Sequence, residues 1–382
     1  MGASMAFGWL PVILGVCIVA PQSPAGPEAS IVRAKRAYAR AVELEAQKND
    51  TAALSLLWEA AGLAPRNPDI QNRLGEALER IGALEAAIAA YRVAVSASPD
   101  ARKLSNNLIL ALVRGGQGPE AVERARALIT LAPDDPDRYF TLGLAQSEQD
   151  VNGALATFRR VLELAPRHTL ARYNLALVLK RSDRLSDALE ELDRALAIEP
   201  RPEAYYTQGV IYWHQGDLER AVRALREAVA AEPRYAEAYF ALGSVLKAKR
   251  DWPGAVAALR RAIVLRPDLP AGHYTLGQVL RLRGDEKAAG TALDHAERLR
   301  RRGQLDQEAT VWTSVGTQKL DAGDLPGALA LFRRAISVSD GYAPAYYQMG
   351  RTLQRLGEDD ASRRAFARAA QLNPSLLAPR NP

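Results

Sequence analysis

Residues 236–267 read AEAYFALGSVLKAKRDWPGAVAALRRAIVLRP and predict two short helices joined by a tight turn. The first half places apolar or small residues at the three- and four-residue spacing of one helix face: Tyr239, Leu242, Gly243 and Leu246. The second half does the same with Ala255, Leu259 and Ala262. Asp251 can cap the second helix and Pro267 stops it. The stretch is therefore one helix–turn–helix unit.

This unit recurs along the chain with a fixed period. The prolines that end the second helix recur at a nearly constant spacing of about 34 residues: Pro65, Pro99, Pro133, Pro166, Pro200, Pro233 and Pro267. A period in this range is typical of repeat proteins, in which each unit buries its apolar face only by stacking on its neighbours. The chain is rich in Ala, Leu, Arg and Glu, which favours helix nearly throughout. We therefore expect an all-α solenoid.

The side chains inside each period resemble those of the tetratricopeptide repeat, in which W-x2-L-G-x2-Y is followed by A-x3-F and P over about 34 residues. The first-helix pattern appears as Trp312-x2-Val315-Gly316, Tyr139-x2-Leu142-Gly143, His273-x2-Leu276-Gly277 and Gln71-x2-Leu74-Gly75. The second-helix pattern appears as Ala87-x3-Tyr91, Ala154-x3-Phe158, Ala221-x3-Leu225 and Ala328-x3-Phe332. The turns often read Gly-Asp, as in Gly216-Asp217, Gly284-Asp285 and Gly323-Asp324. The resemblance implies a right-handed α-solenoid of about ten units with a concave groove lined by the first helices.

The pattern divides the chain into segments of different character. We expect a signal-like segment at 1–25, a linker at 26–33, units 1–8 at 34–303, an insertion at 304–308, units 9–10 at 309–376 and a tail at 377–382. The insertion is needed because the interval from Pro267 to Pro374 is slightly longer than three periods. We expect a lengthened helix at this join. It is either a tolerated insertion or a hinge or docking site for an acidic partner.

The apolar run Met5–Ala20 (MAFGWLPVILGVCIVA) is followed by a Pro/Ser/Gly segment. It is too short to span a bilayer and resembles the apolar core of a secretory signal, although no Lys or Arg precedes it. An uncleaved anchor and a misassigned start are the alternatives. We expect an exported protein, periplasmic or secreted, that meets the membrane only through this segment if it is retained.

Composition and motifs argue against several classes of protein. The net charge of +6 is modest, and no compact basic patch interleaved with aromatics points to nucleic acid. The one cysteine, Cys17, lies in the apolar run, so no thiolate nucleophile or thiolate metal site is expected elsewhere. The four histidines form no H-x3-H pair, and no phosphate-binding loop or G-x-S-x-G occurs. Only SLLAPRNP follows the last unit, so we expect no catalytic domain, no enzyme activity, no metal and no cofactor.

A row of residues beside the packing face of the first helices is the candidate binding surface. The fifth position of five successive units is aromatic, and nearby positions add polar and cationic groups. The predicted ligand-binding residues are Phe140, Tyr173, Asn174, Tyr206, Thr207, Trp213, Phe240, Lys247, Tyr274, Arg281 and Tyr347. Rigid rings with short polar side chains suit an extended peptide, and Arg and Lys favour an acidic or C-terminal carboxylate group. The alternative is that the rings mainly pack against the neighbouring unit.

These observations predict a non-catalytic protein–protein interaction scaffold of the bacterial envelope or exterior, which binds extended peptide segments. One alternative is an accessory subunit of an envelope polysaccharide-export or secretion complex. Another, a cytosolic regulator, requires that the N-terminal segment is retained.

Overall fold

The computed structural model describes residues 27–99, 101–373 and 376. The predicted signal segment 1–25 and the tail 377–382 therefore lie outside the described residues. Nineteen helices form the described part of the chain, which confirms the all-α prediction. Residues 27–33, which we expected to be a linker, lie in the first helix instead, because the apolar and helix-forming sequence of α1 (Pro27–Ala46) extends back to Pro27.

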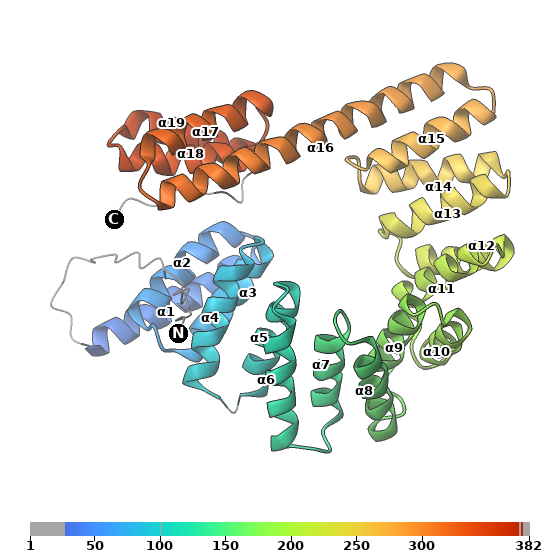
Figure 1. Cartoon of the computed structure of the whole chain (residues 1–382), viewed down its shortest axis with the longest axis horizontal. Helices are drawn as coiled ribbons and strands as arrows, with labels where there is room; N and C mark the ends of the chain where they lie inside the picture. The colour runs from blue at the N-terminus through green and yellow to red at the C-terminus, as the bar shows by residue number, and fades with distance from the viewer. Residues whose placement is uncertain (1–26, 100, 374–375, 377–382) are drawn as a thin grey trace, which may run out of the picture.

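The helices pack in sequential pairs, and each pair is called a unit below. The first helices of units 1–8 are α1 (Pro27–Ala46), α3 (Pro68–Arg80), α5 (Arg102–Arg114), α7 (Pro136–Gln146), α9 (Thr169–Arg181), α11 (Pro202–His214), α13 (Ala236–Ala248) and α15 (Pro270–Leu282). The second helices of units 1–7 are α2 (Asp50–Leu63), α4 (Leu84–Ala97), α6 (Gly118–Leu131), α8 (Val151–Leu164), α10 (Leu185–Ile198), α12 (Leu218–Ala231) and α14 (Trp252–Leu265). Together they form a curved array that Figure 1 shows as an arc.

One long helix, α16 (Glu286–Asp321), joins units 8 and 9. Its N-terminal half pairs with α15 as the second helix of unit 8. Its C-terminal half pairs with α17 (Leu325–Val338) as the first helix of unit 9, and α18 (Ala343–Arg355) with α19 (Asp359–Leu372) completes unit 10. The sequence has no proline between residues 271 and 325 to stop the helix, which permits its length of 36 residues. The lengthened helix expected here is present as one continuous α-helix.

Small residues let the two helices of a unit approach closely. A Cβ atom on Gly143 would lie 2.6 Å from the ring of Phe158, and one on Gly243 would lie 2.6 Å from Leu259 Cγ. Tyr91, Phe158 and Phe332, at the A-x3-F position of their units, are the largest fully buried side chains among the described residues. The glycine of the first helix and the bulky residue of the second therefore form one interlocking contact.

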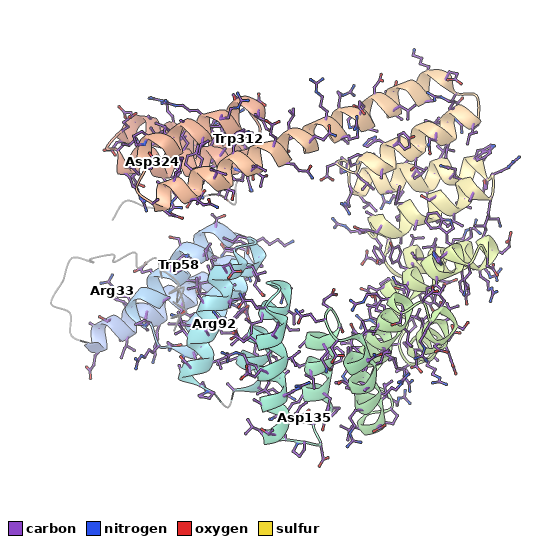
Figure 2. All side chains as sticks on the ribbon, viewed as in Figure 1. Arg33, Trp58, Arg92, Asp135, Trp312 and Asp324 are labelled. Atoms are coloured by element: carbon purple, nitrogen blue, oxygen red, sulfur yellow. The ribbon has the colours of Figure 1, made fainter. Side chains whose placement is uncertain are left out.

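The turns between helices follow the predicted Gly-Asp chemistry. Gly216 and Gly323 have φ of 79° and 83°, in the left-handed region that glycine adopts without strain. Asp324, which is labelled in Figure 2, then accepts a hydrogen bond from the Gly327 amide at 2.9 Å, and this bond caps α17. In unit 7, Arg250 takes the glycine's place with φ of 63°, and Asp251 caps α14 through the Gly254 amide at 3.0 Å.

Candidate functional site

The first helices lie next to one another across the units. Adjacent first helices contact each other in the pairs α3–α5, α5–α7, α9–α11, α11–α13 and α13–α15. Figure 1 shows α5, α7, α9 and α11 nearer the middle of the curved array than their partners α6, α8, α10 and α12. The predicted ligand-binding residues all lie on first helices, from α7 to α15 and, for Tyr347, on α18.

Most rings of the aromatic row are half-buried between units. The ring centroid of Phe140 lies 4.9 Å from that of His168, the residue that precedes α9 of the next unit. Tyr206 lies 5.3 Å from Tyr235, which precedes α13 in the same way. Each ring therefore also packs against the neighbouring unit.

The other half-buried rings pack within their own unit or in the apolar core. Tyr347 makes an edge contact with Phe366 of its own unit at 5.5 Å. Phe240 packs against the apolar core of units 6–8. Burial raises the pKa of the Tyr173 and Tyr206 phenols, as expected for rings partly removed from water. These rings are partly buried within the array, and their role toward a ligand stays a prediction.

The polar side chains among the predicted ligand-binding residues donate hydrogen bonds within the chain. Thr207 is buried and its hydroxyl donates to the Glu203 carbonyl at 2.8 Å. Asn174 Nδ2 donates to the Leu170 carbonyl at 2.8 Å. Lys247 Nζ donates to Gln278 Oε1 of the next unit at 2.6 Å. Each of these donor groups is therefore already hydrogen-bonded within the chain.

Three of the predicted residues are exposed to solvent. Tyr274 on α15 is 53% exposed and Trp213 on α11 is 37% exposed. The Arg281 guanidinium is also exposed, 3.8 Å from Glu286. Trp213 and Arg281 occupy the same position of their units, two periods apart. The accessible part of the candidate surface is therefore concentrated in units 6–8.

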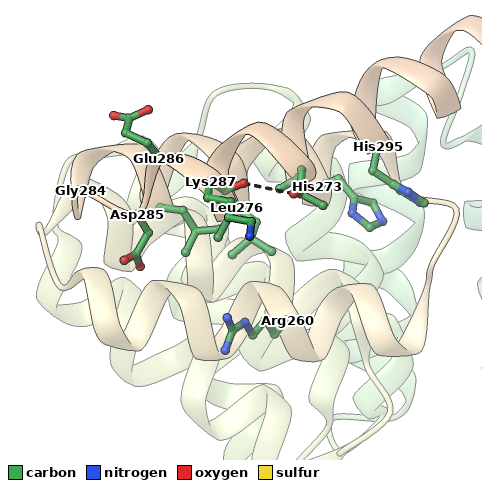
Figure 3. A pocket seen from close by; sticks show the side chains of 12 residues that line it. Arg260, His273, Leu276, Gly284, Asp285, Glu286, Lys287 and His295 are labelled. Atoms are coloured by element: carbon green, nitrogen blue, oxygen red, sulfur yellow. Dashed lines mark hydrogen bonds between the residues drawn. The ribbon is translucent and has the colours of Figure 1, made fainter.

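A separate cleft of about 940 Å³ lies between α14, α15 and α16 (Figure 3). Its floor contains Leu276, Leu280 and Ala292, and its rim carries Arg260, Asp285, Glu286 and Lys287. His273 and His295 face each other at one end, with ring centroids 4.2 Å apart. His273 Nε2 lies 3.0 Å from the Pro267 carbonyl oxygen.

Sequence reasoning missed this histidine pair, although its spacing contains a signal. In units 9 and 10, Arg334 lies over Trp312 and Arg368 lies over Tyr346. His273 and His295 have the same separation in sequence as each of these pairs. Burial, followed by the proximity of His273 and Arg298, lowers the pKa of His295. Since Arg298 Nη2 lies 3.3 Å from His295 Nδ1, the contact favours a neutral imidazole.

Within the described residues, no group of three or more His, Cys, Asp or Glu side chains could hold a metal ion. Over the same part of the chain, no helix combines the length and the hydropathy needed to cross a bilayer.

Comparisons with known proteins identify the repeat family and similar folds. The tetratricopeptide repeat family matches residues 33–102, 145–209, 206–270, 245–304 and 343–376. A tetratricopeptide repeat protein from Parabacteroides merdae ATCC 43184 is 17% identical, with 65% of this chain and 99% of that chain covered and a TM-score of 0.52. TTC0263, a thermophilic TPR protein of Thermus thermophilus, is 22% identical, with 47% of this chain and 99% of that chain covered and a TM-score of 0.42.

YrrB, described as a TPR protein with an unusual peptide-binding site, is 20% identical, with 47% of this chain and 93% of that chain covered and a TM-score of 0.42. No curated protein matches the chain in sequence. The family matches cover well over half of the residues, and the paired helices repeat with the same period. The chain therefore belongs to the tetratricopeptide repeat family.

Proposed function

We propose that this protein-interaction scaffold is non-catalytic, acts in the bacterial envelope or exterior, and binds extended segments of partner proteins along its first helices. The observation that carries the proposal is the group of exposed side chains on α11 and α15: Trp213, Tyr274 and Arg281. A rigid aromatic ring loses little entropy on binding and offers a large contact area. Families of this kind are typically non-catalytic and bind protein or peptide partners.

The charge of the exposed group suggests the chemistry of the segment. The Arg281 guanidinium interacts with Glu286 only at 3.8 Å and on the surface, where ion pairs contribute little. It remains available for a bidentate contact with a carboxylate. The preferred segment is therefore acidic or ends in a free C-terminal carboxylate.

A direct test uses two fluorescein-labelled peptides of one extended sequence of alternating Asp and Leu, with a free or an amidated C-terminus. Fluorescence anisotropy with the purified chain gives Kd for each peptide. We expect Tyr274→Ala to weaken binding at least tenfold and Arg281→Gln to weaken it while reducing the preference for the free carboxylate. Val264→Ala, at an exposed site on α14, is the matched control and leaves Kd unchanged. Equal affinities for the wild type, Tyr274→Ala and Arg281→Gln contradict the proposal.

The location rests on a different feature, the apolar run Met5–Ala20, which lies outside the described residues. A cleaved secretory signal predicts a mature N-terminus near residue 26. N-terminal sequencing of the protein from fractionated cells tests this. An intact Met1 on cytoplasmic protein contradicts the export proposal and leaves the binding proposal unaffected.

A further inference from the structure

The join between units 8 and 9 differs from every other join in the described array. Elsewhere a short turn separates the second helix of one unit from the first helix of the next. Here the single helix α16 supplies both the second helix of unit 8 and the first helix of unit 9, with no turn between them. Figure 1 shows the middle of α16 crossing from the helices around α15 to those around α17 without a neighbouring helix in that view.

The side chain that stacks one unit on the next is also different at this join. Near the end of the second helix, units 2–7 and unit 9 have a partly buried aliphatic residue that packs into the core: Val95, Ile129, Leu162, Leu196, Val229, Ile263 and Ile336. Ile263 Cγ1, for example, lies 3.3 Å from the position that a Cβ on Gly272 of the next unit would take. The equivalent residue of unit 8 is Glu297, which is exposed and paired with Arg300 at 2.6 Å. Unit 8 therefore lacks the aliphatic side chain that stacks these other units on their neighbours.

Unit 9 nevertheless keeps an apolar face at the positions that a preceding helix would cover. We define the open face of unit 9 by Val311 and Val315, the third and seventh residues of its first-helix segment. Val311 is 60% exposed and Val315 is 39% exposed. The equivalents of Val315 in units 2–8 are all buried: Leu74, Leu108, Leu142, Leu175, Gln208, Leu242 and Leu276. The equivalents of Val311 include the buried Ile70, Leu104, Ala171, Ala204, Ala238 and Ala345.

An arginine-rich stretch of α16 precedes the open face, and the carboxylates of Asp306 and Glu308 lie between the two. Residues 297–302 read ERLRRR, with four arginines and one glutamate, a net charge of +3. At 100° per residue, Arg300 and Arg301 lie on the side of α16 that carries Val311, about three turns before it. Glu308, on the same side, accepts a hydrogen bond from Trp312 Nε1 at 3.3 Å.

We propose that the open face of unit 9 is a docking site for an amphipathic α-helix of a partner protein. The shape of the occupant follows from the other units, in which a helix with an aliphatic residue such as Ile263 covers the equivalent face. Its charge follows from the arginines: acidic residues belong at the end that lies toward Arg300 and Arg301. This site is separate from the exposed group on α11 and α15, so it adds a second surface with a different kind of partner.

The test uses helix-stapled peptides based on α14, the helix that covers the equivalent face of unit 8. One has the native sequence of residues 251–266, and the other carries the changes Arg260→Glu, Arg261→Glu and Arg266→Glu. Stapling is needed because an isolated helix of this length is marginal in water. Fluorescence anisotropy with the full chain is expected to give a lower Kd for the acidic peptide, with a difference that shrinks at high salt.

Two variants decide whether the peptide binds at the open face. Val311→Asp is expected to raise the Kd of the acidic peptide at least tenfold. Val264→Asp introduces the same charge at a valine of α14 that is 67% exposed, and it is expected to leave Kd unchanged. Both variants are expected to keep the melting temperature of the wild type, because neither valine is buried.

Four outcomes overturn the proposal. The first is equal Kd values for the two variants, and the second is no binding of the acidic peptide. The third is a large loss of melting temperature in Val311→Asp alone, which means that the chain itself covers the face. The fourth is a dimer, measured by light scattering, that Val311→Asp converts to a monomer, which assigns the face to a second copy of this chain.

Discussion

At the scale of single residues, the same repeat position carries different chemistry in different units. In units 9 and 10 an aromatic ring of the first helix lies under an arginine, as Trp312 does under Arg334. In unit 8 the corresponding residues are the two imidazoles of His273 and His295. Two cations in contact repel each other, so this pair responds to pH where the Trp312–Arg334 pair of unit 9 does not.

The histidine pair predicts a loss of stability at mildly acidic pH. The folded chain lowers the pKa of His295, so the unfolded chain binds that proton more readily as the pH falls through the ordinary histidine value of about 6.5. The free energy of unfolding is therefore expected to fall between pH 7 and pH 5. Carboxylates with lowered pKa, such as Glu297 and Asp324, lose their contribution at lower pH and lie outside this window.

Urea denaturation at pH 7 and pH 5.5 measures this effect. His295→Gln is expected to lose less stability over the window than the wild type. The matched control, His214→Gln on α11, is expected to lose as much as the wild type. Identical losses in all three proteins contradict a role for His295.

At the scale of elements, the sequence predicts most of the helix pairs because the relevant contacts lie within one period. The spacing of Gly143 and Phe158, or of Gly243 and Leu259, is visible in the repeat pattern and becomes the close contact of the folded pair. The candidate site is less predictable. Phe140 and Tyr206 are half-buried by His168 and Tyr235, which belong to the next unit and to no recognisable motif position. The repeat position of an aromatic residue therefore does not show whether its ring remains accessible to solvent.

Two glycine substitutions are expected to have opposite effects on stability. In Gly243→Ala, the new Cβ lies 2.6 Å from Leu259 Cγ and 3.2 Å from the Leu259 amide nitrogen, so overpacking is expected to cost about 1–3 kcal/mol. Gly303, in the middle of α16, has no other atom within 4 Å of its would-be Cβ. Gly303→Ala is expected to stabilise the helix by up to about 1 kcal/mol through helix propensity.

Urea midpoints of the two variants and the wild type provide the measurement. An unchanged or lower midpoint for Gly303→Ala is the result that contradicts a continuous α16, since alanine gains nothing where the helix is broken.

At the scale of the whole molecule, α16 fixes the relation between units 1–8 and units 9–10. Each unit of a solenoid is stabilised mainly by its immediate neighbours, so the two parts depend on each other only through this helix and its contacts. Every join at which the sequence provides a proline at the end of the second helix forms a turn, from Pro65 to Pro267. The join between units 9 and 10 forms a turn without a proline, at Ser339–Tyr342, whereas the join between units 8 and 9 has neither a proline nor a turn.

Introducing a proline at this join is expected to change the shape of the molecule while the units stay folded. In Gln304→Pro, the ring removes a backbone hydrogen bond and clashes with the preceding turn, which breaks or kinks the helix at a cost of about 3 kcal/mol. The break falls between unit 8 and unit 9, where Arg300, Gly303 and Gln304 are exposed and no core contact is lost. Small-angle X-ray scattering is expected to show a changed distance distribution, while circular dichroism shows nearly the same helix content. Gln304→Ala, which keeps the helix, is expected to reproduce the wild-type scattering, and a wild-type curve for Gln304→Pro would show that other contacts hold the two parts in place.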